Sequence, residues 1–194
     1  TDIANEPDDQ MSLVRFLLYS NQFDVEGLVA TTSTWMKKAV RPDVIHSVLD
    51  AYEKVQPNLL KHAPGFPTAA ALRGVVAPGQ PAYGMAAVGS GRMSPGAELI
   101  IRAAEKKDPR PLWVLAWGGA NTLAQALSEV RSGRTPEEGA AIVSKLRVYA
   151  ISFGSNPLRP RRHLHRLLGR AFARETFVIY GVGRTIELMP GIQV

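Results

Sequence analysis

The sequence predicts an α/β fold with a Rossmann-like, mostly parallel sheet flanked by helices. Strand-length apolar stretches alternate along the chain with segments whose apolar residues recur at helical spacing. The stretch 112–117 is continuously apolar, and 23–31 is partly so, as expected for strands covered on both faces. Because strand and helix keep alternating, the strands should run parallel and be joined by right-handed crossovers.

The first predicted elements are a helix, a strand and a second helix. Met11 to Tyr19 is apolar around much of its helical surface, which predicts a helix packed in the interior. A strand is expected from Phe23 to Thr31. The second helix should start at Arg41 and end near Val55, because Pro57 and the prolines after it interrupt the helical pattern.

The middle of the chain continues the alternation after a long turn-rich loop. Ser94, Asn121 and Thr135 each stand where a helix N-cap is expected, and Thr135 opens a capping box. The remaining predicted elements are a loop at 78–91, a helix at 94–106, a strand at 112–117, a helix at 121–130, a helix at 135–146 and a strand at 147–152.

Bulk properties restrict the class of protein. The chain has 194 residues, the size of one domain, and contains no cysteine, so it forms no disulfide and uses no thiolate. No run of about 18 apolar residues is long enough to span a membrane. The chain starts without methionine, which suggests a fragment or a processed product.

The net charge of +6 is concentrated at the C-terminal end. Residues 151–194 hold seven arginines and two glutamates, so this segment carries +5 and the first 150 residues carry only +1. Nucleic acid is therefore an unlikely partner for the main body. A basic nucleic-acid binder that uses Arg159 to Arg174 is a third possibility for the tail, and such binding should weaken steeply with salt.

The change in composition after Ser152 predicts two parts, an α/β domain at 1–152 and a basic segment at 153–194. In the basic segment we expect a solvated helix to about Arg174 and a strand from 176 to 182. His163 and His165 would point to different faces of a helix, which makes a metal pair unlikely. His46 and His62 have no readable partner and are interpreted as structural.

The first ten residues carry four carboxylates directly before the first helix. One interpretation is a well-formed helix start, in which Asn5 is the N-cap, Pro7 fits the first turn, and Asp8 and Asp9 complement the helix dipole. The other is a site for a hard cation, because oxygen ligands packed this densely suit Ca²⁺ or Mg²⁺ better than zinc.

Three segments resemble the nucleoside hydrolase superfamily. Asp2 followed by Asn5-Glu6-Pro7-Asp8-Asp9 resembles its N-terminal motif, and the version here is most similar to the nucleoside-hydrolase-like domain of bacterial cellulose-binding proteins. Segment 26–36 resembles the family's strand that is followed by a Thr/Ser loop. Segment 113–124 resembles the family's strand, glycine turn and helix. The resemblance covers residues 1–152 and implies an apparently truncated nucleoside hydrolase-like fold.

The resemblance implies hydrolysis of an N-glycosidic bond between a ribosyl-type sugar and a base, assisted by Ca²⁺. By motif position Asp9 is the first candidate metal ligand, and Asn121 would add its backbone carbonyl. Asp8 would contact a sugar hydroxyl or the metal. Asp2 is a candidate for both metal binding and catalysis. We therefore predict a catalytic pair of Asp2 and Asp8.

The sequence departs from the family's pattern at the position of the general base. The family places an aspartate four residues before the first of the paired aspartates, where this chain has Ala4. Either Asp2 fills that role across an insertion, or Asn5 and Glu6 have changed the site. The family's C-terminal metal-binding aspartate also has no counterpart after Ser152.

The alternative is a non-catalytic carbohydrate-binding or cellulose-binding module on the same fold. Asn5, Glu6, Trp35 and Tyr83 are the predicted substrate-binding residues, and Trp35 or Trp117 would provide a stacking surface. The predicted partner is a small nucleoside or glycoside or a polysaccharide, with no membrane and with the oligomeric state left open. The resemblance implies an extracellular or periplasmic location.

Overall fold

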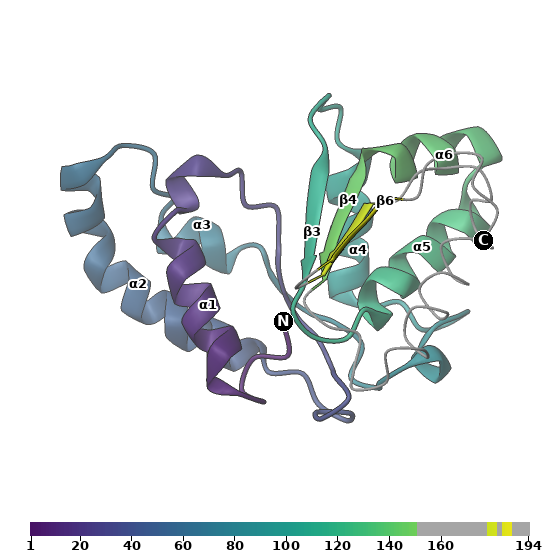
Figure 1. The fold of residues 1–194 in the computed structure, drawn as a ribbon, viewed down its shortest axis with the longest axis horizontal. Helices are drawn as coiled ribbons and strands as arrows, with labels where there is room; N and C mark the ends of the chain where they lie inside the picture. Colours follow the sequence, from purple (N-terminus) through teal and green to yellow (C-terminus); the bar gives the residue numbers. More distant parts are fainter. Residues whose placement is uncertain (151–177, 182–183, 188–194) are drawn as a thin grey trace.

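The computed structural model describes residues 1–150 in full and the backbone of the short strands at 178–181 and 184–187. Helices and strands alternate along most of the chain (Figure 1). The helices are α1 Pro7–Leu17, α2 Pro42–His62, α3 Ala69–Arg73, α4 Pro95–Glu105, α5 Asn121–Gly133 and α6 Pro136–Lys145, with short 3₁₀ turns η1 Ser20–Gln22 and η2 Met85–Ala87. The strands are β1 Leu28–Ala30, β2 Val76–Pro78, β3 Leu112–Ala116, β4 Leu146–Ala150, β5 Val178–Gly181 and β6 Arg184–Glu187.

The strands form two sheets within the described residues. β1 pairs in parallel with β2, and in the second sheet β4 pairs in parallel with β3 on one side and with β5 on the other. Only β6 runs antiparallel, beside β5. The predicted α/β class and its mostly parallel strands are thus confirmed, although the strands lie in two sheets and not one.

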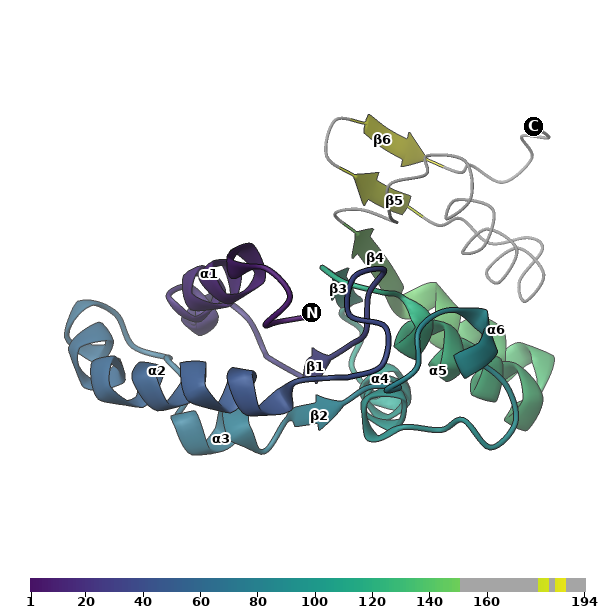
Figure 2. The ribbon, with the colours of Figure 1, turned by 90° about the horizontal axis from the view of Figure 1, so that it is seen from below.

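Each sheet has its own hydrophobic core, and the helices that surround the two cores form two halves of the molecule (Figures 1 and 2). The first core lies among α1, α2, α3 and β1, and its innermost side chains include Ile3, Ile45 and Leu49. The second core lies among α4, α5, α6, β3 and β4 and includes Leu127 and Val143. The chain start lies between these two halves (Figure 1).

Helix α1 is less buried than its composition suggests. Leu13 and Leu17 are buried, whereas Met11 and Val14 on the opposite face are exposed. The prediction of an interior helix was therefore wrong: one apolar stripe suffices to cover the core, and the other apolar residues face solvent. The N-cap is Glu6, without a side-chain bond, and not Asn5.

Helix α2 does not end near Val55. It continues through Pro57 to His62. Leu59, beyond the proline, packs against the first core, and the Tyr52 hydroxyl donates to the Pro67 carbonyl at 2.8 Å. Burial and these tertiary contacts outweigh the hydrogen bond that proline removes from a helix.

Strands β1 and β3, which face each other, differ from their predicted forms. β1 covers only Leu28–Ala30 instead of 23–31. β3 has nearly its predicted length, but Trp113 and Leu115 are 53% and 42% exposed, so it is not the buried strand expected from its sequence. In the described part of the chain, β1 and β3 are each paired along one edge only, which accounts for both differences.

The other local predictions are largely confirmed. Ser94 caps α4, and Thr135 and Glu138 form a complete capping box at α6. Asn121 is not the cap of α5, because Ala120 occupies that position. Helix α3 and strand β2 were not predicted. β5 falls within the predicted strand 176–182, whereas the predicted basic helix with His163 and His165 lies outside the described residues.

No helix in the described part of the chain has both the length and the apolarity that a membrane crossing requires.

Candidate functional site

The chain start lies at the carboxyl ends of β1 and β3. The Thr1 amino group donates to the Val29 carbonyl at 3.0 Å, and the Thr31 N–H donates to the Thr1 carbonyl at 2.7 Å. From the other half, the Gly119 N–H donates to the Thr32 carbonyl at 2.7 Å. Open α/β folds bind ligands at this edge of the sheet, so the residues gathered here are the candidate site.

Two carboxylates are buried at this point. Asp2 and Asp9 are only 7% and 5% exposed. The Thr1 hydroxyl donates to Asp9 Oδ2 at 2.5 Å. The pKa of Asp9 is raised to about 6, mainly by burial and to a smaller extent by the nearby Asp2, while the Thr1 hydroxyl and amino group oppose the rise. The groups around Asp9 therefore do not fully offset the cost of burying its negative charge.

The Thr1 amino group is also buried, and this burial lowers its pKa, while Asp9 and Asp2 raise it in part. The amino group and the two carboxylates thus interact electrostatically.

Glycines at the end of β3 make room for Asp2. A Cβ added at Gly118 would lie 2.7 Å from Asp2 Oδ1 and 2.8 Å from the Asp2 backbone nitrogen. A Cβ at Gly119 would lie 2.5 Å from the Thr32 carbonyl oxygen. These distances are shorter than any ordinary contact, so only glycine lets the β3–α5 turn approach the first residues this closely.

A second polar group surrounds the pair. Thr31, Thr32 and Ser33 follow β1 and are all buried. The Thr32 hydroxyl donates to Asn121 Oδ1 at 3.2 Å, and Asn121 Nδ2 donates to the Ala82 carbonyl at 2.8 Å. Asn121 thereby connects the loop after β1 to the loop after β2.

One buried polar atom of this group lacks a partner among the residues that the structure describes. Thr31 Oγ1 makes no hydrogen bond to any of them. An unpaired buried hydroxyl costs about 1–3 kcal/mol. Such an atom beside a candidate site is typical of a position where a ligand, an ion or a water supplies the missing bond.

An aromatic rim lies beyond the polar group. Trp35 is 70% exposed. The Tyr83 hydroxyl is hydrogen-bonded to the Thr34 hydroxyl at 2.8 Å, and the Tyr83 N–H donates to the Lys37 carbonyl at 3.0 Å. The loops after β1 and β2 thus hold each other in place and present two aromatic side chains.

The structure brings only some of the predicted site residues together. Asp2 and Asp9 lie close, and Asn121 is linked to the same strand end through Thr32. Asp8 and Glu6 are exposed on the outer side of the first turn of α1.

Asn5 is half-buried, and its N–H donates to the Asp2 carbonyl at 3.1 Å. This turn places Ala4 at a positive φ of 81°, a conformation that alanine rarely adopts. The first residues are therefore held in a bent path that directs Asp2 inward. The assignment of chemical roles to these residues stays a prediction.

Sequence reasoning missed Thr1 and Gln125. Thr1 carries no recognisable signal. Gln125 is fully buried in α5, where its Oε1 accepts from the Gly89 N–H at 2.7 Å and its Nε2 donates to the Gly89 carbonyl at 3.1 Å. A glutamine within an otherwise apolar helical stripe was the available signal. Its contacts anchor the loop that carries Tyr83.

The donor set suits a hard cation only in part. The oxygens of Asp2, Asp9 and the neighbouring hydroxyls are the ligand type that Ca²⁺ prefers, but Ca²⁺ takes six to eight oxygens. The described residues contain no group of three or more His, Cys, Asp or Glu placed to hold a metal. A cation here would need carbonyl, water or substrate oxygens to complete its shell.

The fold and the site define an α/β domain of Rossmann type with a buried acidic pair at its strand ends. The chain belongs to the family described as cellulose-binding Sde182, nucleoside hydrolase-like domain, whose family model matches residues 1–176. The matched range extends beyond Ser152, where the resemblance read from the sequence ended. The division into a domain at 1–152 and a separate tail stays a prediction.

A solved structure supports the same assignment. The chain is 43% identical to a nucleoside hydrolase-related hypothetical protein from Saccharophagus degradans that is associated with carbohydrate metabolism, with a TM-score of 0.81. The match covers 89% of this chain and 40% of that protein, so the chain spans less than half of its length. No curated protein matches this chain.

Proposed function

We propose that Asp2 and Asp9 of this chain form the acidic part of an active site. The proposed site binds glycosides and hydrolyses the N-glycosidic bonds of ribosyl-type sugars. The observation that carries the proposal is the buried pair of Asp2 and Asp9, with the pKa of Asp9 raised to about 6. A carboxylate with a pKa near neutrality is suited to accept a proton from water or to bind a cation.

The proposed reaction is a hydrolysis. The oxygen of a water molecule bonds to the anomeric carbon, the bond from that carbon to the base nitrogen breaks, and the base leaves with the electron pair and takes up a proton. Asp2 is positioned to accept the proton of the attacking water. Asp9 holds the opposite side of the site, and Asp8, which is exposed on the outer side of the first turn of α1, has no part in this step.

Calcium is the proposed cofactor. Bound between Asp2, Asp9 and the Asn121 carbonyl, it would orient a water and the sugar diol and lower the pKa of that water. Support comes from the oxygen-only donor set, from the incompletely compensated Asp9 and from the unpaired Thr31 hydroxyl.

The second candidate is a carbohydrate-binding module without catalysis. The high exposure of Trp35 favours it, because exposed tryptophans next to polar groups are suited to stack on sugar rings. The exposed position of Asp8 and the alanine at position 4 also favour it, since the family's catalytic carboxylates are then incomplete. Sugars or polysaccharides are the proposed ligands in both cases, and we propose an extracellular or periplasmic location from the family name.

Calcium titration by calorimetry tests the proposed cofactor. We expect the chain to bind Ca²⁺ and Asp9→Asn to lose binding at least about tenfold, because it removes one of two buried carboxylates. Asp8→Asn is the matched control, since Asp8 is exposed on the same helical turn. Equal binding by all three proteins, or by none, contradicts a calcium site at Asp9.

A substrate screen separates the two candidate functions. Release of the base from nucleosides, or of nitrophenol from a nitrophenyl riboside, supports the enzyme if Asp2→Asn lowers the rate at least about a hundredfold. Retention on cellulose or oligosaccharides without any release supports the binding module. In that case Trp35→Ala should weaken retention without lowering the melting temperature, because an exposed side chain contributes little to folding.

A further inference from the structure

One face of helix α5 carries three polar side chains at intervals of four residues. They are Asn121, Gln125 and Glu129, and this spacing places them one above another, about 6 Å apart along the helix axis. Asn121 and Gln125 are buried, and Glu129 is half-buried. The Gln125 Nε2 donates to Glu129 Oε1 at 2.6 Å. Because Asn121 lies at the candidate site, this row of side chains begins there.

The row holds the loop after β2 at two points. Asn121 Nδ2 donates to the Ala82 carbonyl at 2.8 Å. Gln125 holds Gly89 with both ends of its amide, because its Oε1 accepts from the Gly89 N–H at 2.7 Å and its Nε2 donates to the Gly89 carbonyl at 3.1 Å. Between these points Ala87 is fully buried and η2 contacts α5. The segment 82–89, which we call the anchored loop, is therefore fixed to one helix.

The anchors of this loop are much closer together than the chain between them is long. Seven extended residues span about 23 Å, whereas the two anchoring side chains start about 6 Å apart along α5. The middle of the anchored loop therefore bulges outward. Tyr83 and Met85 are exposed there. The Tyr83 hydroxyl is hydrogen-bonded to the hydroxyl of Thr34, which precedes Trp35 in the chain.

The anchored loop has little order of its own. Gly84 and Gly89 have φ values of 82° and 131°, which glycine adopts freely and other residues rarely do. Glycine also loses more conformational entropy than any other residue when its backbone is fixed. The contacts with α5 offset this cost, so without them the loop would sample many conformations.

The amide at position 125 acts on the loop more than on the helix. Gln125 is fully buried, and most other buried residues of α5 are apolar. Because the net contribution of a buried hydrogen bond to stability is modest, an apolar side chain of the same length would hold α5 in the core nearly as well. The double contact to Gly89 is what only the amide supplies.

We propose that Gln125 is a positioning residue, which holds the anchored loop in its sugar-binding conformation before any sugar is present. The inference rests on the proposed function, because the ligand of the aromatic rim is taken to be a sugar. Gln125 acts through Gly89 on Tyr83, so that Tyr83 and Trp35 form a preformed surface. A preformed surface loses less conformational entropy on binding, which raises affinity. Gln125 therefore sets the affinity for sugar and not the chemistry at Asp2 and Asp9.

Backbone ¹⁵N relaxation of Gln125→Met tests the proposal on the loop itself. Methionine has a similar length and no amide, so α5 keeps its packing while the contact to Gly89 is lost. We expect the order parameters of residues 83–88 to fall from about 0.85 to below about 0.6, and the melting temperature to change by less than about 3 °C.

Two further variants separate the amide contact from a general disturbance of α5. Glu129→Ala is the matched control, because it removes the neighbouring polar side chain and leaves both bonds to Gly89 in place, so the loop should stay ordered. Gly89→Ala disturbs the same anchor from the side of the loop, since alanine rarely adopts a φ of 131°. It should loosen the loop even if Gln125→Met fails to fold.

Titration with cellohexaose and with adenosine measures the effect on the site. For whichever of them the unaltered chain binds, we expect Gln125→Met to raise Kd at least about tenfold and Glu129→Ala to leave it within about twofold. If the chain hydrolyses adenosine, KM should rise in the same way while kcat stays within about threefold.

Three results overturn the proposal. The first is a loop that stays ordered in both Gln125→Met and Gly89→Ala, and the second is an equal loss of order in Glu129→Ala. The third is a loosened loop with unchanged Kd and KM, whether or not kcat falls. If the unaltered chain binds neither sugar, the proposed function is contradicted instead, and the order parameters alone decide whether Gln125 positions the loop.

Discussion

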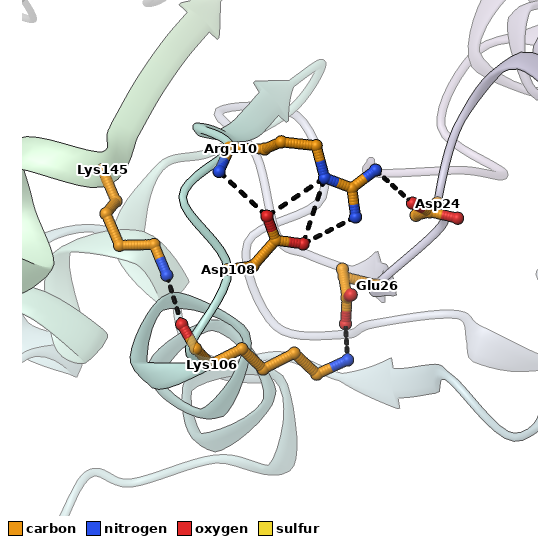
Figure 3. Close-up of polar contacts among 6 residues, drawn as sticks. All are labelled: Asp24, Glu26, Lys106, Asp108, Arg110 and Lys145. Carbon is orange, nitrogen blue, oxygen red and sulfur yellow. Dashed lines mark hydrogen bonds and ion pairs between the residues drawn. The ribbon is translucent and has the colours of Figure 1, made fainter.

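Carboxylates at the two ends of strands β1 and β3 have opposite environments. At the carboxyl ends of these strands Asp9 is buried, and its pKa is raised to about 6. At their amino ends Asp108 accepts hydrogen bonds from the Arg110 guanidinium and backbone, which lower its pKa to about 2 (Figure 3). The difference teaches that the carboxylates at the carboxyl ends are candidates for chemistry, whereas those at the amino ends form ion pairs that connect the two halves.

The largest expected effect is at Gly118. Gly118→Ala places a methyl group within 3 Å of the Asp2 side chain and backbone, so the first residues must move. We expect a loss of about 2–3 kcal/mol in the free energy of unfolding and weaker cation binding, measured by urea titration and calorimetry. Gly133→Ala is the control, because no atom of the described residues lies within 4 Å of its new Cβ. Equal effects at both glycines would contradict the close approach at Asp2.

A smaller effect is expected in the pH dependence of stability. Because the folded state raises the pKa of Asp9 to about 6, it binds the proton more tightly than the unfolded chain. The stabilisation is therefore full below about pH 4 and is lost as pH rises through 6. After allowance for solvent screening, we expect the free energy of unfolding to fall by roughly 1–2 kcal/mol over this pH range.

Asp9→Asn isolates this contribution, because the Thr1 amino group, whose pKa is lowered by burial, changes stability in the opposite direction and favours the folded state more as pH rises toward 8. Thermal melts between pH 4 and 7, with chelator present, should show a steeper decline for the wild-type chain than for the variant. A decline that persists unchanged in Asp9→Asn would assign it to other groups. Asp108 acts in the reverse direction, with stabilisation lost only as pH falls from about 4 through 2.

The smallest effect is expected at the amino ends of β1 and β3. Arg110→Gln removes the exposed pairs with Asp24 and Asp108. Exposed ion pairs contribute little and are screened by salt, so the melting temperature should fall by about 2 °C or less, and by even less in 1 M salt. A salt-insensitive fall of 5 °C or more would show that these residues act through packing and not through charge.

The sequence determined the local elements because their signals are local. The capping box at Thr135, the cap at Ser94 and the proline at the first turn of α1 each act within four residues, and all are present in the structure. The α/β class and the parallel strands followed from the alternation of patterns. The acidic motif before α1 also led to Asp2 and Asp9, because residue type and order suffice to recognise a motif.

Only the tertiary structure decided which side chains are buried, which pair and which remain free. The sequence pattern predicts Trp113 and Leu115 as core residues. In the structure they line the groove between β1 and β3, because one edge of β3 is unpaired in the described residues. Pro57 reads as a helix end yet lies within α2, because packing of Leu59 outweighs a lost hydrogen bond. Asp8 and Asp9 are equivalent as neighbours in sequence, but the helix turns one outward and buries the other beside Asp2. Burial, and with it the pKa that makes Asp9 a candidate for chemistry, depends on residues distant in sequence, so no local pattern can specify it.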